Sequence, residues 1–199
     1  NNLININGDT EIQVSEAVAF TGTLWCSSSN IADLTGIEAF TALTTLYCAN
    51  NQLTSLDVTQ NSALTILHCQ TNQLTSLDVS QNTALITVEC FSNQLTSLDV
   101  SNNTVLNRLF CYSNQLSCLN VKNGNNSNFT FFTAESNPNL TCIEVDDAAW
   151  STANWTFIDA QTSFSTSCAN PCALGITNLS NTPKQLVKIV DLMGRETPY

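Results

Sequence analysis

The stretch Leu53-Thr-Ser-Leu-Asp-Val58 decides the architecture of this 199-residue chain. The same six residues recur at 74–79 and at 95–100, so each copy begins 21 residues after the previous one. A fixed period this short is typical of stacked units that contact only their neighbours along the stack. The repeat therefore predicts a solenoid, an elongated fold without one central core.

One complete unit covers residues 64–84. Its first part, residues 64–74, reads L-x-x-L-x-C-x-x-N-x-L, and its second part, which shares Leu74 and runs to Asn82, reads L-x-x-L-D-V-x-x-N. Within it, apolar Leu67 and Cys69 alternate with polar His68 and Gln70, which is the period-two pattern of a half-buried strand. The template is used twice in each period, so every unit supplies two short extended segments. Stacking of such units buries a continuous apolar strip that no single unit could bury.

This pattern resembles the leucine-rich repeat family, specifically its short bacterial class, over about residues 20–145. The resemblance implies a right-handed leucine-rich repeat solenoid, rich in β-structure and poor in helix. It places parallel strands on a concave face and short extended segments on the convex face. We predict an N-terminal cap with the first rung at 1–30, repeats at 31–145, a C-terminal cap at 146–172 and the start of a further β domain at 173–199.

Two series of asparagines recur at the repeat period. We predict that both lie inside the turns, where their amides satisfy backbone groups that point away from the strands. The first series is Asn51, Asn72, Asn93 and Asn114, and the second is Asn61, Asn82 and Asn103.

Nine cysteines are an odd number and form two groups. Five share one repeat position: Cys26, Cys48, Cys69, Cys90 and Cys111. Side chains in one column of parallel rungs point the same way and cannot surround a zinc ion tetrahedrally or pair easily as disulfides, so we interpret this column as core. The others lie nearer the C-terminus: Cys118, Cys142, Cys168 and Cys172. For these we predict a Cys142–Cys168 disulfide, with Cys118–Cys142 as the alternative, and either suits a secreted protein.

The net charge of −11, with only Arg108 and Lys122 as bases before residue 184, argues against nucleic acid or anionic lipid as a partner. No apolar run is long enough to insert into a membrane. No signal peptide is recognisable, and we interpret the chain as a mature or trimmed form. The sole histidine, His68, has no triad partner placed by a motif, and no nucleotide or metalloprotease motif is present. We therefore predict a protein that is not an enzyme.

The N-terminal segment resembles the calcium loop of EF-hand and dockerin proteins. The ligand positions of that loop fall on Asn5, Asn7, Asp9, Glu11 (through its carbonyl) and Glu16. Asparagine replaces aspartate at the first position, and Thr10 stands where the sharp turn needs glycine. These departures predict weak calcium binding at most, and we favour a loop that only caps the stack.

The two C-terminal segments differ in composition. Residues 146–165 are rich in aromatics, including Trp150, Trp155 and Phe157, and we interpret them as a lid over the last rung. Residues 185–196 resemble the start of the C-terminal sorting domain of Bacteroidetes-type bacteria, which implies export and release or anchoring at the cell surface. The alternative is an ordinary strand that extends the cap.

The solvent-facing positions of the main strands vary at nearly every rung and carry many aromatics. The register predicts a central column of Trp25, Tyr47, His68, Glu89, Phe110 and Thr133. The flanking columns are Ser27, Ala49, Gln70, Phe91, Tyr112 and Glu135 on one side, and Thr23, Thr45, Ile66, Thr87, Arg108 and Phe131 on the other. Contiguous exposed aromatics indicate a binding partner. We expect the strongest contacts from Phe91, Phe110, Tyr112 and Phe131, with Arg108 beside them.

The predicted function is non-catalytic recognition or adhesion outside the cell, with a protein partner bound on this face. The first alternative is a surface glycan on the same face, and the competing interpretation is that the rings pack on one another and on a second copy in a homodimer. A third alternative is a structural or ice-binding surface formed by the row Thr54, Thr75 and Thr96. The column Asp57, Asp78 and Asp99 could hold calcium between rungs, but we favour hydrogen bonds to turn amides.

Overall fold

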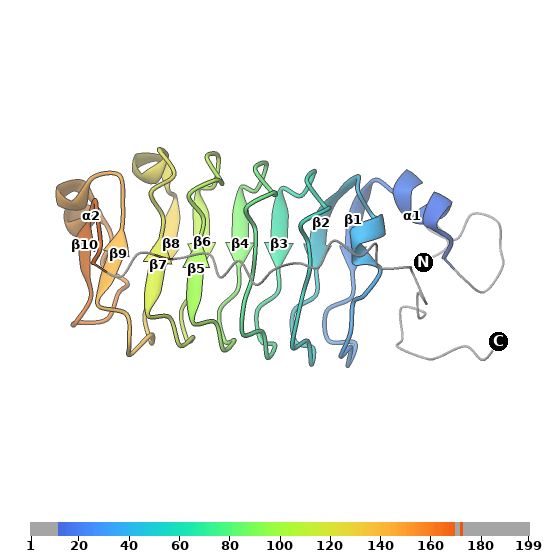
Figure 1. Cartoon of the computed structure of the whole chain (residues 1–199), viewed down its shortest axis with the longest axis horizontal. Coiled ribbons are helices and arrows are strands. Elements are labelled where there is room, and N and C mark those ends of the chain that lie inside the picture. Colours follow the sequence, from blue (N-terminus) through green and yellow to red (C-terminus); the bar gives the residue numbers. More distant parts are fainter. Residues whose placement is uncertain (1–11, 170–171, 173–199) are drawn as a thin grey trace.

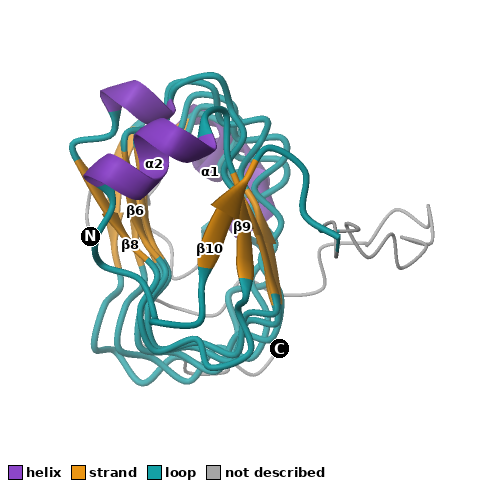
Figure 2. Ribbon diagram, turned by 90° about the vertical axis from the view of Figure 1, so that its left-hand side faces the viewer, coloured by secondary structure: helices purple, strands orange, loops and turns teal. Residues whose placement is uncertain are grey.

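The computed structural model describes residues 12–169 and 172, which form an elongated solenoid of parallel strands with little helix (Figure 1). Viewed from the end, two sheets stand opposite each other and loops join them (Figure 2). One sheet has six strands in the order β1-β2-β3-β4-β6-β8, and the other has four in the order β10-β9-β7-β5. Each pairing within the sheets is parallel. The predicted leucine-rich repeat solenoid is confirmed.

The elements are short and follow the repeat. The six-stranded sheet contains β1 (Gly22–Trp25), β2 (Leu43–Tyr47), β3 (Ile66–His68), β4 (Thr87–Glu89), β6 (Arg108–Phe110) and β8 (Phe131–Thr133). The four-stranded sheet contains β5 (Ser97–Asp99), β7 (Cys118–Asn120), β9 (Cys142–Glu144) and β10 (Ser163–Ser165). The helical elements are α1 (Val14–Ala19), η1 (Ile37–Ala39), η2 (Asn126–Asn128) and α2 (Ala148–Asn154).

Leucine stacked on leucine forms the core between the two sheets. The register places Leu46, Leu67, Val88 and Leu109 opposite one another on β2, β3, β4 and β6, and all are fully buried. The five cysteines at the shared repeat position are also buried and free, as predicted. The interior is therefore one continuous apolar strip along the axis.

The first asparagine series forms the predicted ladder inside the turns. The Asn93 amide nitrogen donates to the carbonyls of Cys69 (3.1 Å) and Cys90 (3.0 Å), and its oxygen accepts from the Leu74 N–H (3.0 Å). One side chain thereby joins two adjacent rungs. The same contacts recur at Asn72 and Asn114.

The second series also joins adjacent rungs at the opposite turns, but only through its amide nitrogens, because its buried amide oxygens accept no hydrogen bond. The Asn82 amide nitrogen donates to the carbonyls of Val58 (2.8 Å) and Asn61 (2.9 Å), and the other members of this series make equivalent bonds. The aspartate column accepts hydrogen bonds from turn amides, as predicted: Asp78 Oδ1 accepts from the Ser80 N–H at 2.9 Å. Asp57 and Asp99 repeat this contact.

Both ends of the stack carry a short helix. In α1 the Glu16 carboxylate accepts from the Gln13 N–H at 3.0 Å, which closes a capping box. In α2 the Asp147 carboxylate accepts from the N–H groups of Ala149 and Trp150. The other predicted ligands of the calcium loop, residues 5–11, lie outside the described residues.

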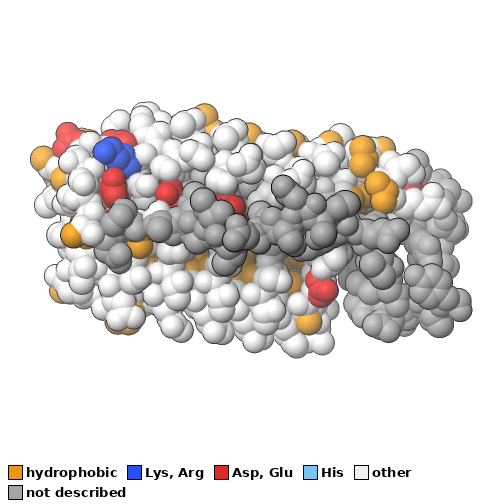
Figure 3. Space-filling model, viewed as in Figure 1, with side chains coloured by type: hydrophobic (Ala, Val, Ile, Leu, Met, Phe, Trp, Pro, Cys, Tyr) orange, Lys and Arg blue, Asp and Glu red, His pale blue; other side chains and the backbone are white. Residues whose placement is uncertain are grey.

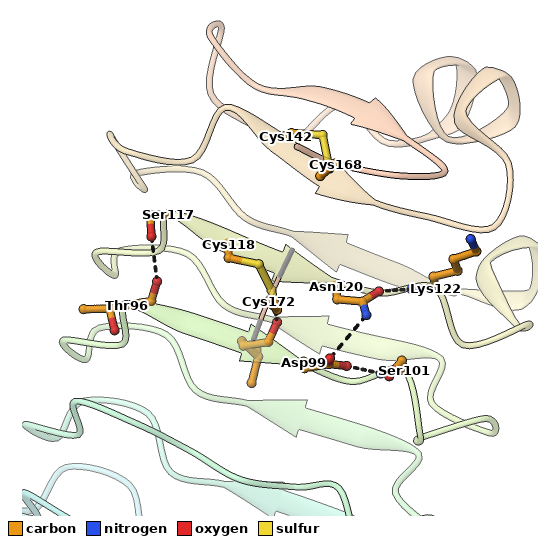
Figure 4. The surroundings of a disulfide bond; sticks show 11 residues. Thr96, Asp99, Ser101, Ser117, Cys118, Asn120, Lys122, Cys142, Cys168 and Cys172 are labelled. Carbon is orange, nitrogen blue, oxygen red and sulfur yellow. Dashed lines mark hydrogen bonds between the residues drawn. A yellow bond between two sulfur atoms is a disulfide. The ribbon is translucent and has the colours of Figure 1, made fainter. Parts of the chain in front are cut away.

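Two disulfides attach the chain that follows β10 to the outer side of the four-stranded sheet (Figure 4). The predicted Cys142–Cys168 bond is confirmed. The alternative Cys118–Cys142 is wrong, because Cys118 bonds Cys172 instead. The side chains of Cys118 and Cys142 lie on neighbouring rungs and point the same way, so they do not bond each other. Each pairs instead with a cysteine that follows β10. The predicted sorting segment after residue 172 lies outside the described residues.

We expect Asn93→Ala to lower the free energy of unfolding by about 3–5 kcal/mol, because it leaves several buried backbone groups without a partner. The measurement is urea unfolding followed by circular dichroism. Gln94→Ala is the matched control, since this neighbouring side chain is exposed. Equal effects of the two substitutions would contradict a structural role for the ladder.

A second prediction concerns Thr71, which adopts a left-handed backbone conformation at φ 55°. This region is costly for a β-branched residue, whereas asparagine tolerates it and occupies the equivalent Asn50. Thr71→Asn should raise the free energy of unfolding by about 0.5–1 kcal/mol. Thr75→Asn, at an exposed position without positive φ, should not stabilise the protein in the same urea titration.

Candidate recognition face

The outward-facing residues of the six-stranded sheet form what we call the variable face. Strand register confirms the predicted central column: Trp25 pairs with Tyr47, then His68, Glu89, Phe110 and Thr133 follow on successive strands. The flanking column through Thr45, Ile66, Thr87, Arg108 and Phe131 is likewise in register. The predicted site residues on these strands therefore do lie on one face.

Three threonines predicted to face solvent are buried instead: Thr45, Thr87 and Thr133. Their side chains are short and lie below the level of longer neighbours. Thr133 lies between Phe110 and Phe157 in the central column, and both of these rings stack on Phe131. The buried threonines leave the contact surface to the exposed side chains around them.

At the N-terminal end of this face, Trp25 stacks on Tyr47 with ring centroids 4.0 Å apart. The Trp25 side chain is 67% exposed. Tyr47 meets the His68 ring edge-on, and His68 Nε2 lies 3.5 Å from Glu89 Oε1. The aromatic stack thus ends at the His68–Glu89 contact in the middle of the face.

At the C-terminal end lie two stacks of rings, which we together call the phenylalanine cluster: Phe91 with Tyr112, and Phe110 with Phe131 and Phe157. Phe91 stacks on Tyr112 at 4.4 Å between centroids, and Phe110 stacks on Phe131 at 4.7 Å. The Arg108 guanidinium carbon lies 5.7 Å from the Phe110 centroid, within cation–π range. The predicted grouping of these residues is therefore observed.

Phe157 was predicted to belong to the lid, but the structure places it on the variable face. The Ala134 N–H donates to the Phe157 carbonyl at 2.9 Å, as the Cys111 N–H donates to the carbonyl of Thr133 one rung earlier. Phe157 therefore continues the central column. Its ring is 49% exposed and stacks on Phe131 at 5.9 Å. The repeat motif has disappeared at this point, so pattern matching could not find it.

Burial dominates the electrostatics of the site. It lowers the pKa of His68, against a raising effect of the Glu89 carboxylate, while Arg108 lowers that pKa further. Burial, with a smaller contribution from Glu89, raises the pKa of Tyr112. In the cysteine column, burial raises the pKa of Cys69 to about 12, so this thiol stays protonated and serves as core.

The opposite side of the solenoid is regular and polar. Thr54, Thr75 and Thr96 are exposed there at successive rungs. Where it is not covered by grey, the view in Figure 3 is mostly white, the colour of uncharged polar side chains and backbone, with scattered hydrophobic side chains and carboxylates and little basic charge. The variable face differs from this side in its varied and aromatic residues.

Within residues 12–169 and 172, no group of three or more His, Cys, Asp or Glu side chains is arranged to hold a metal ion. None of the helices described is long and apolar enough to cross a bilayer.

Comparison with known proteins agrees with this fold. A leucine-rich repeat family model of two copies matches residues 41–82. Together with the register and the asparagine ladders, this match defines the chain as a leucine-rich repeat solenoid.

Internalins of Listeria monocytogenes are among the proteins that the chain is similar to. Internalin J of serotype 4b strain F2365 is 45% identical over 53 residues, which are 27% of this chain and 6% of the relative. The solved functional domain of InlJ, described as including a cysteine ladder, has a TM-score of 0.59 and 36% identity over 67% of this chain. The chain spans only 32% of that structure's length. Internalin InlF has a TM-score of 0.55 over 81% of this chain and 45% of its own length, and at 22% identity it supports the fold alone.

The lowered pKa of His68 predicts how stability depends on pH. In the unfolded chain a histidine titrates near about 6.5, so folding favours neutral His68 and its stabilising contribution is present above this pH. That contribution is lost as the pH falls through the folded pKa. The loss of unfolding free energy between about pH 7.5 and 5 should therefore be smaller in His68→Gln than in the wild type.

Urea titrations at the two pH values measure this difference. Glu89→Gln is the matched comparison, because removing the carboxylate that raises the pKa of His68 should enlarge the fall. An equal fall in wild type and His68→Gln would show that burial of this ring does not control its protonation.

Proposed function

We propose that this protein is a non-catalytic recognition module that binds a protein partner outside the cell through its variable face. The observation that carries the proposal is the concentration of partly exposed rings on one face of a solenoid whose other side repeats small polar residues. Phe131 and Phe157 are 40% and 49% exposed and adjoin each other. Contiguous exposed aromatics of this kind are typical of the central contacts in protein interfaces.

The arrangement of the rings favours a protein over a sugar at the phenylalanine cluster. Saccharides stack on open ring faces, whereas both faces of Phe131 are occupied by its neighbours Phe110 and Phe157. Ring edges and the gaps between them suit apolar side chains of a partner.

An extracellular location is supported by two disulfides, which persist in oxidising compartments. The scarcity of basic residues among those described, Arg108 and Lys122 alone, does not favour nucleic acid. The similarity to internalins supports a role in recognition, although the chain covers a minor part of those proteins.

One observation favours the second candidate, a glycan partner. Trp25 stacks on Tyr47 through one ring face, and with 67% of the side chain exposed it offers the largest exposed aromatic surface among the described residues. A saccharide that used this end of the face would depend on Trp25 and be indifferent to the phenylalanine cluster.

The test compares two arrays, one of purified extracellular protein domains and one of glycans. The wild type is run beside Phe110→Ala/Tyr112→Ala and the control Thr75→Ala/Ser76→Ala, which alters the opposite side. We expect a specific protein domain to bind wild type and control, with at least about tenfold weaker binding to the aromatic variant. A glycan signal that disappears in Trp25→Ala, with no protein signal, would overturn the proposal and establish the glycan alternative.

A further inference from the structure

The ring at the centre of the phenylalanine cluster, Phe131, has a neighbouring ring on each side. Phe131 lies between Phe110 and Phe157, whose rings are inclined to it by only 13° and 19°. Both faces of Phe131 are thus occupied by nearly parallel rings, yet 40% of the side chain remains exposed. Because a nearly parallel ring lies on each side, we take the edge of Phe131 as the part that a partner can reach. Phe91 and Tyr112, inclined by 9°, cover each other's faces in the same way.

A row of ring edges has a definite electrostatic character. The quadrupole of an aromatic ring places negative charge on its faces and positive charge on its edge. Several edges that point outward together form an apolar surface with a weak positive potential. The complementary group is the negative face of another aromatic ring, placed edge-to-face with centroids about 4.5–7 Å apart.

Arg108 adds a full positive charge beside this row. It is exposed, lies against the Phe110 ring, and makes no ion pair with any described residue. The other base among the described residues, Lys122, donates to the Thr166 carbonyl near the C-terminal cap. The planar guanidinium of Arg108 is suited to bind a carboxylate through two parallel hydrogen bonds.

Acidic groups limit how much negative charge a partner can bring. Glu89 lies in the central column next to Phe110, and Glu135 lies in the column that contains Tyr112. A run of carboxylates would be repelled by both, whereas one carboxylate on the Arg108 side would not. The face therefore selects an aromatic group with a single adjacent acid.

Building on the proposed function, we infer that the partner presents an aromatic side chain next to one carboxylate. Its ring face lies across the edges of Phe131 and Phe157, and its carboxylate pairs with Arg108. The recognition surface accordingly includes the C-terminal cap, through Phe157, as well as the repeats. The partner is a protein segment of this composition, defined by its chemistry.

The probe is a phage-displayed library of random peptides, selected on the immobilised full chain. Enriched peptides are then synthesised and their dissociation constants measured by isothermal titration calorimetry. The variants are Phe131→Ala/Phe157→Ala and Arg108→Gln, with Thr75→Ala/Ser76→Ala as the control on the opposite side. Phe157→Ser alone is a second variant, because this single change affects the cap more mildly. Circular dichroism verifies that each variant is folded.

We expect the enriched peptides to carry Phe, Tyr or Trp within two or three positions of Asp or Glu. Their affinity should fall at least about tenfold in the Phe131/Phe157 variant and about tenfold in Arg108→Gln, and it should not change in the control.

Two failures are distinguishable. Peptides that depend on Phe131 and Phe157 but lack an acid, or that ignore Arg108→Gln, would overturn this inference and leave protein recognition in place. Peptides that ignore Phe131→Ala/Phe157→Ala but lose affinity in Phe110→Ala/Tyr112→Ala would likewise overturn this inference alone. Peptides that bind both variants as well as the wild type, or no enrichment at all, would overturn the proposed function together with the inference.

Discussion

The repeated turns of this solenoid depend on asparagine amides that satisfy backbone groups of two rungs. Where the chain leaves a strand, buried backbone carbonyls need a donor from a side chain. Asn93 supplies donors to Cys69 and Cys90 and an acceptor to Leu74, so one side chain completes the hydrogen bonding of a corner. Leucine burial provides the main favourable free energy, but without these amides the corners would leave buried polar groups unpaired.

This requirement explains why the interior and the corners repeat while one surface does not. An asparagine that bonds the preceding rung must stand at the same place in every unit, and so must the leucines that pack beside it. The outward-pointing residues of the six-stranded sheet are free of this restriction, because they contact only solvent and each other. Variation concentrated on this face is therefore compatible with a constant scaffold, and chemistry that differs from rung to rung can accumulate there.

The periodic part of the molecule could be predicted from the sequence, since a 21-residue repeat determines which residues share a column. The columns through Trp25 and Arg108, both asparagine ladders and the buried cysteines follow from that arithmetic. The prediction was wrong where a contact involves a segment beyond the last clear repeat. The Cys118–Cys172 bond depends on a segment that crosses the rungs, and no repeat position encodes it. Phe157 joined the variable face through one backbone hydrogen bond, without a motif.

The spacing of parallel strands also shapes what the variable face can recognise. Adjacent strands lie about 4.8 Å apart, close to the distance at which two aromatic rings stack. Rings on consecutive rungs, such as Phe91 and Tyr112, therefore pack face to face along the axis at 4.4 Å.

Stacking lowers the conformational entropy that these side chains would lose on binding, because they are already ordered. It also removes their faces from contact with a partner. A leucine-rich repeat surface built in this way is rigid and presents edges, whereas the rings at the ends of each stack, Trp25 and Phe157, keep more open surface. Which ring surfaces a partner can contact along this face therefore depends on where each stack of rings begins and ends.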